Sequence, residues 1–406
     1  MADYEHDTSS NTLLTPTIIA KEALMQLTNH LAMSRHVYKA YKNEFVKVGQ
    51  TVTIRKPNKF RVTKAQARTN TDIVEPSTTI TMTVQAHVSW AFSSVELTTT
   101  IEDYSKRYIS PAANALANQV DADLCGLYID VYNYAGTPGN TPATFKVLGD
   151  AQTVLDDESA PSDVGRFGIL NPDANWSLAD GLKGTFAAKV ADNLITKGFL
   201  GQIANLNLYA DQNVVRHTTG IFTTSATPLM NGTTASGATQ IVTNGWNATS
   251  STVEKGDVFT IAGVYAVNTM SGESTGVLRR FVATADAAST GSGDMTISIS
   301  PSIISSGAYQ TVDAVPLTTA ALTFIGTEAT AYPQNLVFHP NAFALVTVPI
   351  EMPSNVWGAR ETDQDAGMSI RVVKQYDIDA DEEIIRLDIL YGIKTLYPEL
   401  ACRLMG

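Results

Sequence analysis

Two stretches of the chain repeat their hydrophobic residues at the spacing of an α-helix. Between residues 111 and 135 the apolar positions recur every three or four residues, which places them on one helix face. Ser110 and Pro111 are typical of a helix start, and Gly136 of a helix end. The pattern therefore predicts a helix over 111–135, roughly 37 Å long. It is either the core helix of a large domain or a mechanical spine. Its apolar stripe consists of Leu116, Val120, Leu124, Leu127 and Val131.

A second helix is predicted to begin at Thr15 and Pro16, after which Ile19, Ala23 and Leu27 repeat every fourth residue. The period then changes to two. Apolar residues alternate with polar ones in "GQTVTIRKP" (49–57) and again in "STTITMTVQAHVSWAFSSVEL" (77–97), which is typical of strands. These two strands and the segment between them predict an extended β-hairpin.

From about residue 223 to 332 the chain becomes rich in Thr, Ser, Gly and Ala, and its charges thin out. Disorder is one interpretation of such a composition. However, short alternating runs with β-branched and aromatic residues recur there: "TQIV", "DVFTIAG", "VYAVN", "VLRRFVAT", "MTISIS" and "ALTFIG". Several short strands between Gly and Ser turns predict a small antiparallel barrel or sandwich. The flanking sequence has a mixed α+β pattern, so this segment is expected to be inserted into one surrounding domain.

The predicted hairpin has a basic tip. No acidic residue occurs from Val46 to Thr71. The tip is a solvated loop, a grip on nucleic acid, or a contact with an acidic neighbouring subunit. Phe60 is its single aromatic residue, which weakens the nucleic-acid interpretation because stacking platforms use several. The candidate intersubunit residues are Arg55, Lys56, Lys59, Arg61, Lys64 and Arg68.

Length and composition limit the classes of protein. A chain of 406 residues can bury a large core without a metal or a disulfide. Its two cysteines, Cys125 and Cys402, lie far apart and are expected to be reduced thiols. The first residues lack a basic stretch followed by an apolar core, and no apolar run is long enough to span a membrane, so we expect neither secretion nor membrane insertion. A net charge of −12 argues against a surface that mainly binds phosphate.

No catalytic pattern is present in the sequence. A phosphate-binding loop, a nucleophile elbow, a zinc-binding HExxH and a dinucleotide-binding GxGxxG are all missing. Asp377, Asp379 and Asp381 have the spacing of a calcium loop, but Glu382 stands where the turn needs Gly, so an acidic turn before a strand is the better interpretation. The six histidines are expected to be surface or packing residues. We therefore expect no enzyme, no catalytic residue, no cofactor and no metal site.

The order of several weak motifs is more informative than any one of them. "GQTVTIRKP" is followed by "FSSVELTTTIEDYSKRYISPAANALANQVDADL", "NLYADQNVVRHTTG", "VEKGDVFTIAGVYAVN", "FHPNAFALVTVPI" and "RLDILYGIKTLYPELACRLMG". Over nearly its whole length the chain resembles the major capsid (coat) protein of tailed double-stranded DNA bacteriophages. It is most similar to the branch of the short-tailed Salmonella phages, whose fold is the Hong Kong ninety-seven type.

The resemblance implies an α+β fold with a defined division of the chain. It implies an N-terminal arm (1–44), an extended loop built as a β-hairpin (45–80), and a peripheral domain (81–159) with a spine helix at 101–135. The axial domain would comprise 160–222 and 333–397, with an inserted β-barrel domain at 223–332 and a C-terminal tail at 398–406. In this interpretation the long helix is a girder in a flat subunit that shares its edges with neighbours.

The resemblance also implies a function and partners. The protein would be a structural subunit that self-assembles into an icosahedral shell of hexamers and pentamers around packaged double-stranded DNA, without sequence specificity. Its partners would be a scaffolding protein, a portal and a decoration protein, and it would reside in the virion after assembly in the host cytoplasm. A nanocompartment (encapsulin-like) shell protein is the alternative within this fold. A hydrolase with an inserted β-domain and a surface adhesin are alternatives from other classes.

Overall fold

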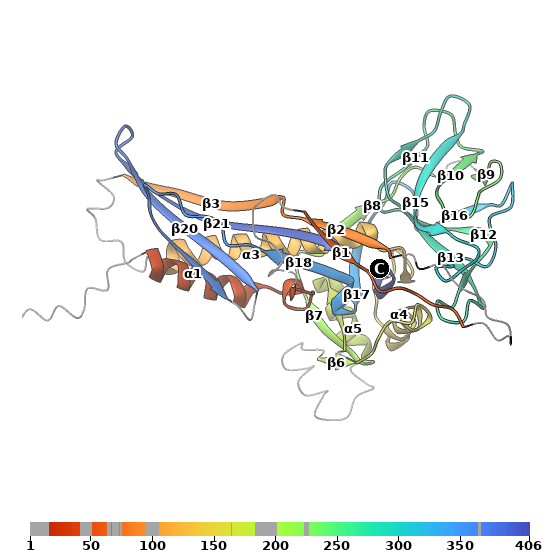
Figure 1. Ribbon diagram of the computed structural model, residues 1–406, viewed down its shortest axis with the longest axis horizontal. Coiled ribbons are helices and arrows are strands. Elements are labelled where there is room, and N and C mark those ends of the chain that lie inside the picture. The colour runs from red at the N-terminus through yellow and green to blue at the C-terminus, as the bar shows by residue number, and fades with distance from the viewer. Residues whose placement is uncertain are drawn as a thin grey trace, which may run out of the picture.

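The computed structural model describes residues 16–40, 51–62, 66, 73, 75–93, 105–163, 165–182, 201–222, 227–363 and 367–406. Figure 1 shows an elongated body that carries a separate β-rich unit at one end. The strands between Leu229 and Phe324 form this unit, which we call the inserted domain. We call the remainder of the described chain the body.

The first sheet of the body lies in the elongated half. Its strands are β3 (Val84–Ser93), β18 (Phe343–Thr347), β19 (Trp357–Asp363), β20 (Met368–Asp377) and β21 (Glu382–Thr395). The antiparallel order is β18-β21-β20-β19, and β3 pairs with the first part of β21. Helices α1 (Pro16–His30) and α3 (Ser110–Cys125) pack against it (Figure 1). Residues 343–395 fall in the segment that the resemblance assigns to the axial domain, and their apolar face packs on these helices.

The core beneath this sheet follows directly from the two periods in the sequence. Ile385, Leu387 and Ile389 of β21 are buried in this core, and so is the predicted stripe of α3 from Leu116 to Leu124. A strand with one buried face and a helix with one buried stripe together make a two-layer core. The helix predicted from Pro16 onwards is described as α1, and Ile19, Ala23 and Leu27 of its predicted stripe are buried in the same core.

The long helix is shorter than predicted over 111–135 or 101–135. The α-helical part is Ser110–Cys125, between a π-helical turn (η3, Ser105–Ile109) and a 3-10 turn (η4, Gly126–Asp130). Ser110 is no N-cap, since Ile109 before it already has helical backbone angles. The chain becomes extended at Val131, because residues 134–136 pair with a strand. Residues 101–104 lie outside the described residues.

The second sheet has seven strands and lies where the body meets the inserted domain. Its order is β4-β22-β17-β5-β7-β6, and β8 pairs with β17. Helices α4 (Phe145–Asp157) and α5 (Pro172–Leu182) share a core with it. The strands are β4 (Tyr134–Gly136), β5 (Arg166–Leu170), β6 (Gln202–Ile203), β7 (Leu206–Ala210), β8 (Arg216–Thr218), β17 (Ala331–Phe338) and β22 (Ala401–Met405).

The segment 398–406, expected to be a tail, is part of this sheet. After a 3-10 turn (η6, Pro398–Leu400), β22 lies between β4 and β17 and is buried along its whole length. Its apolar residues Ala401, Cys402 and Leu404 explain the burial. At Gly136, which has φ +87°, a Cβ would lie 2.5 Å from the carbonyl oxygen of Met405, so only glycine allows β4 to approach.

The inserted domain contains the strands predicted from its alternating runs. Its main sheet has the order β16-β12-β13-β15-β10-β9, and a two-stranded sheet joins β11 to β14. Its own core holds Phe259, Phe281 and Phe324, with ring centroids 5.0–6.0 Å apart around Phe259. The strands are β9 (Leu229–Met230), β10 (Ala238–Asn244), β11 (Thr252–Val253), β12 (Val258–Val267), β13 (Ser274–Ala283), β14 (Ala287–Ala288), β15 (Met295–Ile303) and β16 (Leu322–Phe324).

The chain enters and leaves the inserted domain through one paired neck. Thr218 of β8 lies opposite Ala331 of β17 in antiparallel register. A buried ion pair braces the neck from the side, since Arg279 Nη1 of β13 lies 2.6 Å from Glu158 Oε1 at the end of α4. A hydrogen bond 3.1 Å long joins Thr269 to Ser159 beside it. The two parts are therefore held together by more than their covalent connections.

Candidate intersubunit surface

The predicted hairpin is present, and its base is anchored to the body. Strand β1 (Thr51–Arg55) pairs antiparallel with β2 (Ser77–Thr81), with Thr51 opposite Thr81. Val52, Ile54 and Ile80 are buried and form a small core with Val346 and Leu390 of the body. The hairpin therefore leaves the body from a fixed base.

The first two basic residues of the loop differ in their surroundings. Arg55 makes an exposed ion pair with Glu75 across the hairpin, at 3.4 Å. Such a pair contributes little to stability. Lys56 donates a hydrogen bond to the carbonyl oxygen of Leu396, and its Nζ lies 4.8 Å from the centre of the Tyr397 ring. Burial lowers the pKa of Lys56, although the Glu399 carboxylate opposes this shift.

The next two basic residues lie against the inserted domain. The backbone N–H of Lys59 donates to the hydroxyl of Tyr309 at 3.2 Å. Nη1 of Arg61 donates to Oε1 of Gln310 at 2.8 Å. Lys64 and Arg68, the remaining predicted residues, lie outside the described residues. The structure therefore brings Lys56, Lys59 and Arg61 into contact with their own chain.

Exposed apolar side chains accompany the basic ones. Phe60 is 65% exposed and Val62 is 85% exposed, on either side of Arg61, and Ile73 is also exposed on the returning segment. Within the described residues, no packing contact shields these large apolar side chains from water. A loop that combines basic and apolar residues can contribute both charge and apolar burial to an interface.

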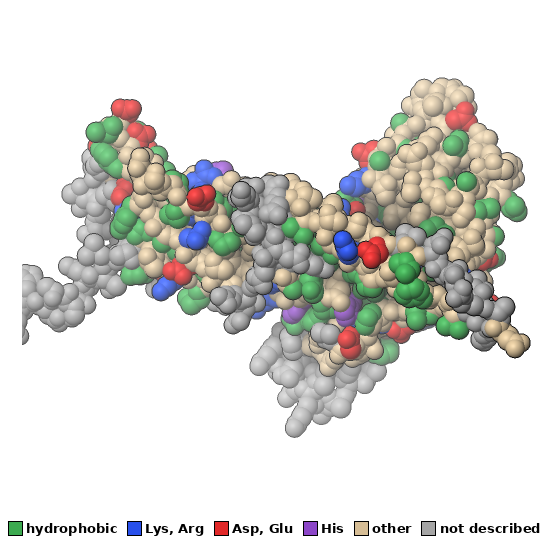
Figure 2. Space-filling view, in the orientation of Figure 1, with side chains coloured by type: hydrophobic (Ala, Val, Ile, Leu, Met, Phe, Trp, Pro, Cys, Tyr) green, Lys and Arg blue, Asp and Glu red, His purple; other side chains and the backbone are tan. Residues whose placement is uncertain are grey.

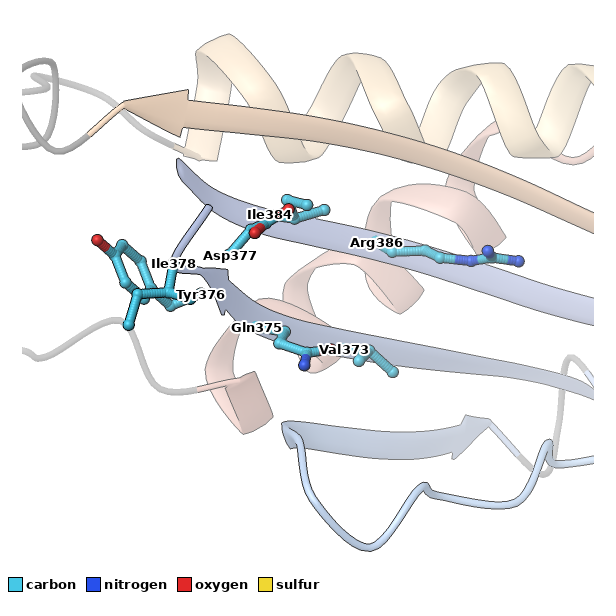
Figure 3. Close-up of a pocket in the computed structure, with 7 residues that line it drawn as sticks. All are labelled: Val373, Gln375, Tyr376, Asp377, Ile378, Ile384 and Arg386. Carbon is cyan, nitrogen blue, oxygen red and sulfur yellow. The ribbon is translucent and has the colours of Figure 1, made fainter. Parts of the chain in front are cut away.

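A second candidate surface lies at the far end of the first sheet, where β20 turns into β21. A hollow of about 480 Å³ is lined there by Tyr376, Ile378 and Ile384, with Arg386 further along β21 (Figure 3). Ile378 is 80% exposed. In Figure 2, acidic and hydrophobic side chains lie together at this tip. An apolar hollow with an acidic rim is suited to contact with another protein surface.

The three aspartates with calcium-loop spacing form this turn. The backbone N–H of Asp379 donates to Asp377, and the hydroxyl of Tyr376 donates to Asp381 at 2.6 Å. The turn leads directly into β21 at Glu382, as the alternative interpretation predicts. Within the described residues, no group of three or more metal-ligating side chains has a geometry suited to a metal ion.

None of the described helices is long and apolar enough to cross a bilayer. Both cysteines are free and buried, and Cys125 lies 3.7 Å from the sulfur of Met33. Burial raises the pKa of Cys402 to about 12, so this thiol is not a reactive thiolate.

The comparison with protein families covers the body, the hairpin and the inserted domain together. The family described as "P22 coat protein - gene protein 5" matches residues 8–406. The chain belongs to the P22 coat protein family. It is therefore a major capsid shell protein of bacteriophage type, and the predicted α+β capsid fold is confirmed. No curated protein matches the chain.

Several solved structures are similar to this coat protein. A chain from Mycobacterium phage Che8 is 14% identical with a TM-score of 0.50, covering 92% of the coat protein and 90% of that chain. The capsid of cyanophage P-SCSP1u is 10% identical with a TM-score of 0.43, covering 91% and 86% of the two chains. The CUS-3 coat protein I-domain is 25% identical with a TM-score of 0.20, covering 26% of the coat protein and 99% of that chain.

The coat protein also contains a buried polar joint that sequence reasoning missed. His217 was expected to be a surface or packing residue, yet its Nδ1 lies 3.0 Å from the Tyr128 hydroxyl and its Nε2 lies 2.9 Å from Asp257. Asp257 also accepts a hydrogen bond from the backbone of Gly220. Because His217 and Asp257 are both nearly inaccessible to solvent, this chain of bonds is no open catalytic site. It joins η4, β8 and the inserted domain.

Arg403 completes this joint from the C-terminal strand. Its fully buried guanidinium donates to the carbonyl oxygen of Gly256 at 2.7 Å and lies over the Tyr128 ring at 5.1 Å. Burial lowers the pKa of Arg403 to about 10, although Tyr128 and Asp257 oppose this shift. The group is therefore still charged at neutral pH. No local motif predicts the joint, because its residues lie far apart in the sequence, from Tyr128 to Arg403.

A third contact fixes the segment after α1 to the second sheet. The ring of His36 stacks on Phe167 of β5 at 4.3 Å and on Tyr209 of β7 at 4.4 Å. Burial, together with the nearby charges of Lys39 and Arg35, lowers the pKa of His36 from 6.5 to about 4. The folded coat protein therefore keeps this ring neutral in mildly acidic solution.

This shift predicts a pH dependence of stability. Below pH 6.5 the unfolded chain binds a proton at His36, whereas the folded chain does so only near pH 4. The stabilisation by the neutral ring is thus present at pH 7 and is lost as the pH falls towards 4. We expect His36→Phe, which keeps a stacked ring but cannot be protonated, to lose less stability than the natural chain between pH 7 and 5.

The measurement is the urea midpoint of the unassembled subunit at both pH values. His36→Ala is the control, since removal of the ring should lower the midpoint at pH 7 as well. Equal losses on acidification in the natural chain and in His36→Phe would contradict the expected shift.

Proposed function

We propose that the coat protein assembles into an icosahedral shell of hexamers and pentamers that encloses packaged double-stranded DNA. The family match over residues 8–406 carries this proposal, because it extends over every element of the subunit, from the N-terminal helix to the last strand. An elongated body with a projecting hairpin and a laterally placed inserted domain also has the form of a subunit that overlaps its neighbours (Figure 1). Such head-to-tail contacts close into rings.

We propose that the basic loop contributes one of these contacts. Four of its seven residues from 55 to 61 are basic and none is acidic, whereas the chain as a whole has a net charge of −12. A basic loop therefore meets a predominantly acidic surface on a second copy, which favours the correct orientation of the two subunits. The exposed Phe60 and Val62 add apolar area to the same contact.

The role that we propose is structural, without a reaction catalysed by the subunit. The buried polar groups of the coat protein join its parts, as at His217 and Arg403, and do not line an open cleft. A scaffolding protein, a portal and a decoration protein are the proposed partners, with assembly in the host cytoplasm and a final location in the virion. The division into arm, loop, peripheral, axial and inserted domains remains part of this proposal.

Negative-stain electron microscopy and sedimentation velocity test the proposal. The coat protein is expressed alone and together with the scaffolding protein of its phage. We expect closed shells or curved sheets that sediment far ahead of the single subunit. A uniform monomer or dimer under both conditions would contradict a shell-forming function.

A further inference from the structure

The segment that leaves β1 runs along the base of the inserted domain (Figure 1). Two hydrogen bonds connect them: the Lys59 N–H donates to the hydroxyl of Tyr309, and Arg61 donates to Gln310. Tyr309 and Gln310 are consecutive residues that follow β15 and lie about 250 positions later in the chain. The inserted domain therefore contacts the loop through one short edge.

Arg61 is held from a second side by Gly272 in the connection between β12 and β13. A Cβ at Gly272 would lie 2.4 Å from the Cζ atom of Arg61, so the guanidinium packs directly on the glycine backbone. The Nε and Nη2 atoms of the same group are buried without a hydrogen-bond partner in the described residues, so Nη1 alone carries the polar contact and the rest of the group contributes packing. Gly272 has φ +75°, which favours glycine, and the lack of a side chain leaves space for the Arg61 guanidinium.

Residues of the body also lie beside the contact between the loop and the inserted domain. Lys59, Glu158, Arg279 and Glu399 line a small cavity of about 120 Å³ between the loop, the inserted domain and the body. The ion pair between Glu158 and Arg279 fixes the inserted domain at this place. Because the domain is braced, the edge that binds Lys59 and Arg61 has a fixed position relative to the hairpin base.

We propose that the inserted domain is a bracket that sets the direction of the extended loop in each subunit before assembly. The proposal rests on the proposed role of the loop as a contact with a neighbouring copy. A loop that is already ordered loses less conformational entropy when it binds. In this arrangement Arg61 is used within the subunit, while Phe60 and Val62 on either side of it remain exposed for a second copy.

Hydrogen–deuterium exchange of the unassembled subunit tests the bracket, because it needs no shell. The natural chain should show slow exchange in peptides that cover residues 56–62. Tyr309→Phe removes the acceptor of the Lys59 N–H, and Gln310→Ala removes the acceptor of Arg61. We expect each variant to exchange these amides about tenfold faster, the effect of losing one hydrogen bond. Arg55→Ala, whose partner Glu75 lies on the hairpin itself, is the matched control without an effect.

Two outcomes separate this proposal from the proposed function. Unchanged exchange in Tyr309→Phe and Gln310→Ala, or rapid exchange in the natural chain, would overturn the bracket even if shells still form. Faster exchange in both variants supports it, and slower shell growth of the same variants, followed by light scattering, is then expected. Protection of the loop in a chain that never assembles would uphold the bracket and refute the shell function instead.

Discussion

Replacing Arg55, Lys56, Lys59 and Arg61 together by glutamate is expected to abolish shell assembly while leaving the subunit folded. The substitution turns a basic loop into an acidic one on a chain that already has a net charge of −12. Like charges brought together at an interface cost several kcal/mol, which is about the free energy of a weak contact between subunits. All four side chains lie outside the cores of the body and of the inserted domain, so the fold should tolerate the change.

Sedimentation velocity and electron microscopy measure the result, and circular dichroism confirms the fold. The double variant Arg55→Glu/Lys59→Glu is the sharper test, since it leaves the bonds of Arg61 and of the Lys59 backbone to the inserted domain intact. It should also fail to form shells if the charges act between subunits. Normal shells from the quadruple variant would return the basic loop to a merely solvating role.

Glu158→Ala is expected to lower the free energy of unfolding by about 3–5 kcal/mol, the usual cost of leaving one member of a buried ion pair alone. The side chains of Arg279 and Glu158 are only 5% and 9% exposed. Burial opposes the charged form of Arg279, but the Glu158 carboxylate and Tyr132 together offset this effect and raise the pKa of Arg279. Without Glu158, the cation would remain buried against the Tyr132 ring, 4.7 Å away.

Urea unfolding of the unassembled subunit gives this free energy. The double variant Glu158→Leu/Arg279→Met should recover most of the loss, because two apolar side chains need no charge partner. Lys146→Ala is the control, since it breaks an exposed pair with Asp150 and should cost less than about 1 kcal/mol. A loss of the same small size in Glu158→Ala would show that the neck does not depend on this ion pair.

Local patterns in the sequence predict those elements whose neighbours are also local. Helix α1, the pairing of β1 with β2 and the strands of the inserted domain follow from hydrophobic period and turn residues. The end of the long helix does not, because Tyr134–Gly136 pair with a strand more than 260 residues later. For the same reason the sequence did not show that the last segment, expected to be a tail, adds a strand between β4 and β17.

The candidate site shows the same limit. Charge composition identified the basic loop, yet it could not show that Arg61 turns towards its own inserted domain. Tyr309 and Gln310 lie in a Ser- and Gly-rich connection that has no distinguishing motif. The joint of Tyr128, His217 and Asp257 could not be predicted from the sequence either. Each of these residue types is common in protein interiors and on surfaces, so none of them alone indicates the contact.

The position of β22 has a consequence for synthesis on the ribosome. Residues 401–405 fill the gap between β4 and β17, and Arg403 reaches from there into the inserted domain. Until these residues leave the exit tunnel, β4 and β17 each present an unpaired edge, which is prone to aggregation and suited to capture by a chaperone. The second sheet is therefore completed only after residues 401–405 have been synthesised. A chain that stops before residue 401 lacks β22 and leaves the second sheet incomplete, with β4 separated from β17.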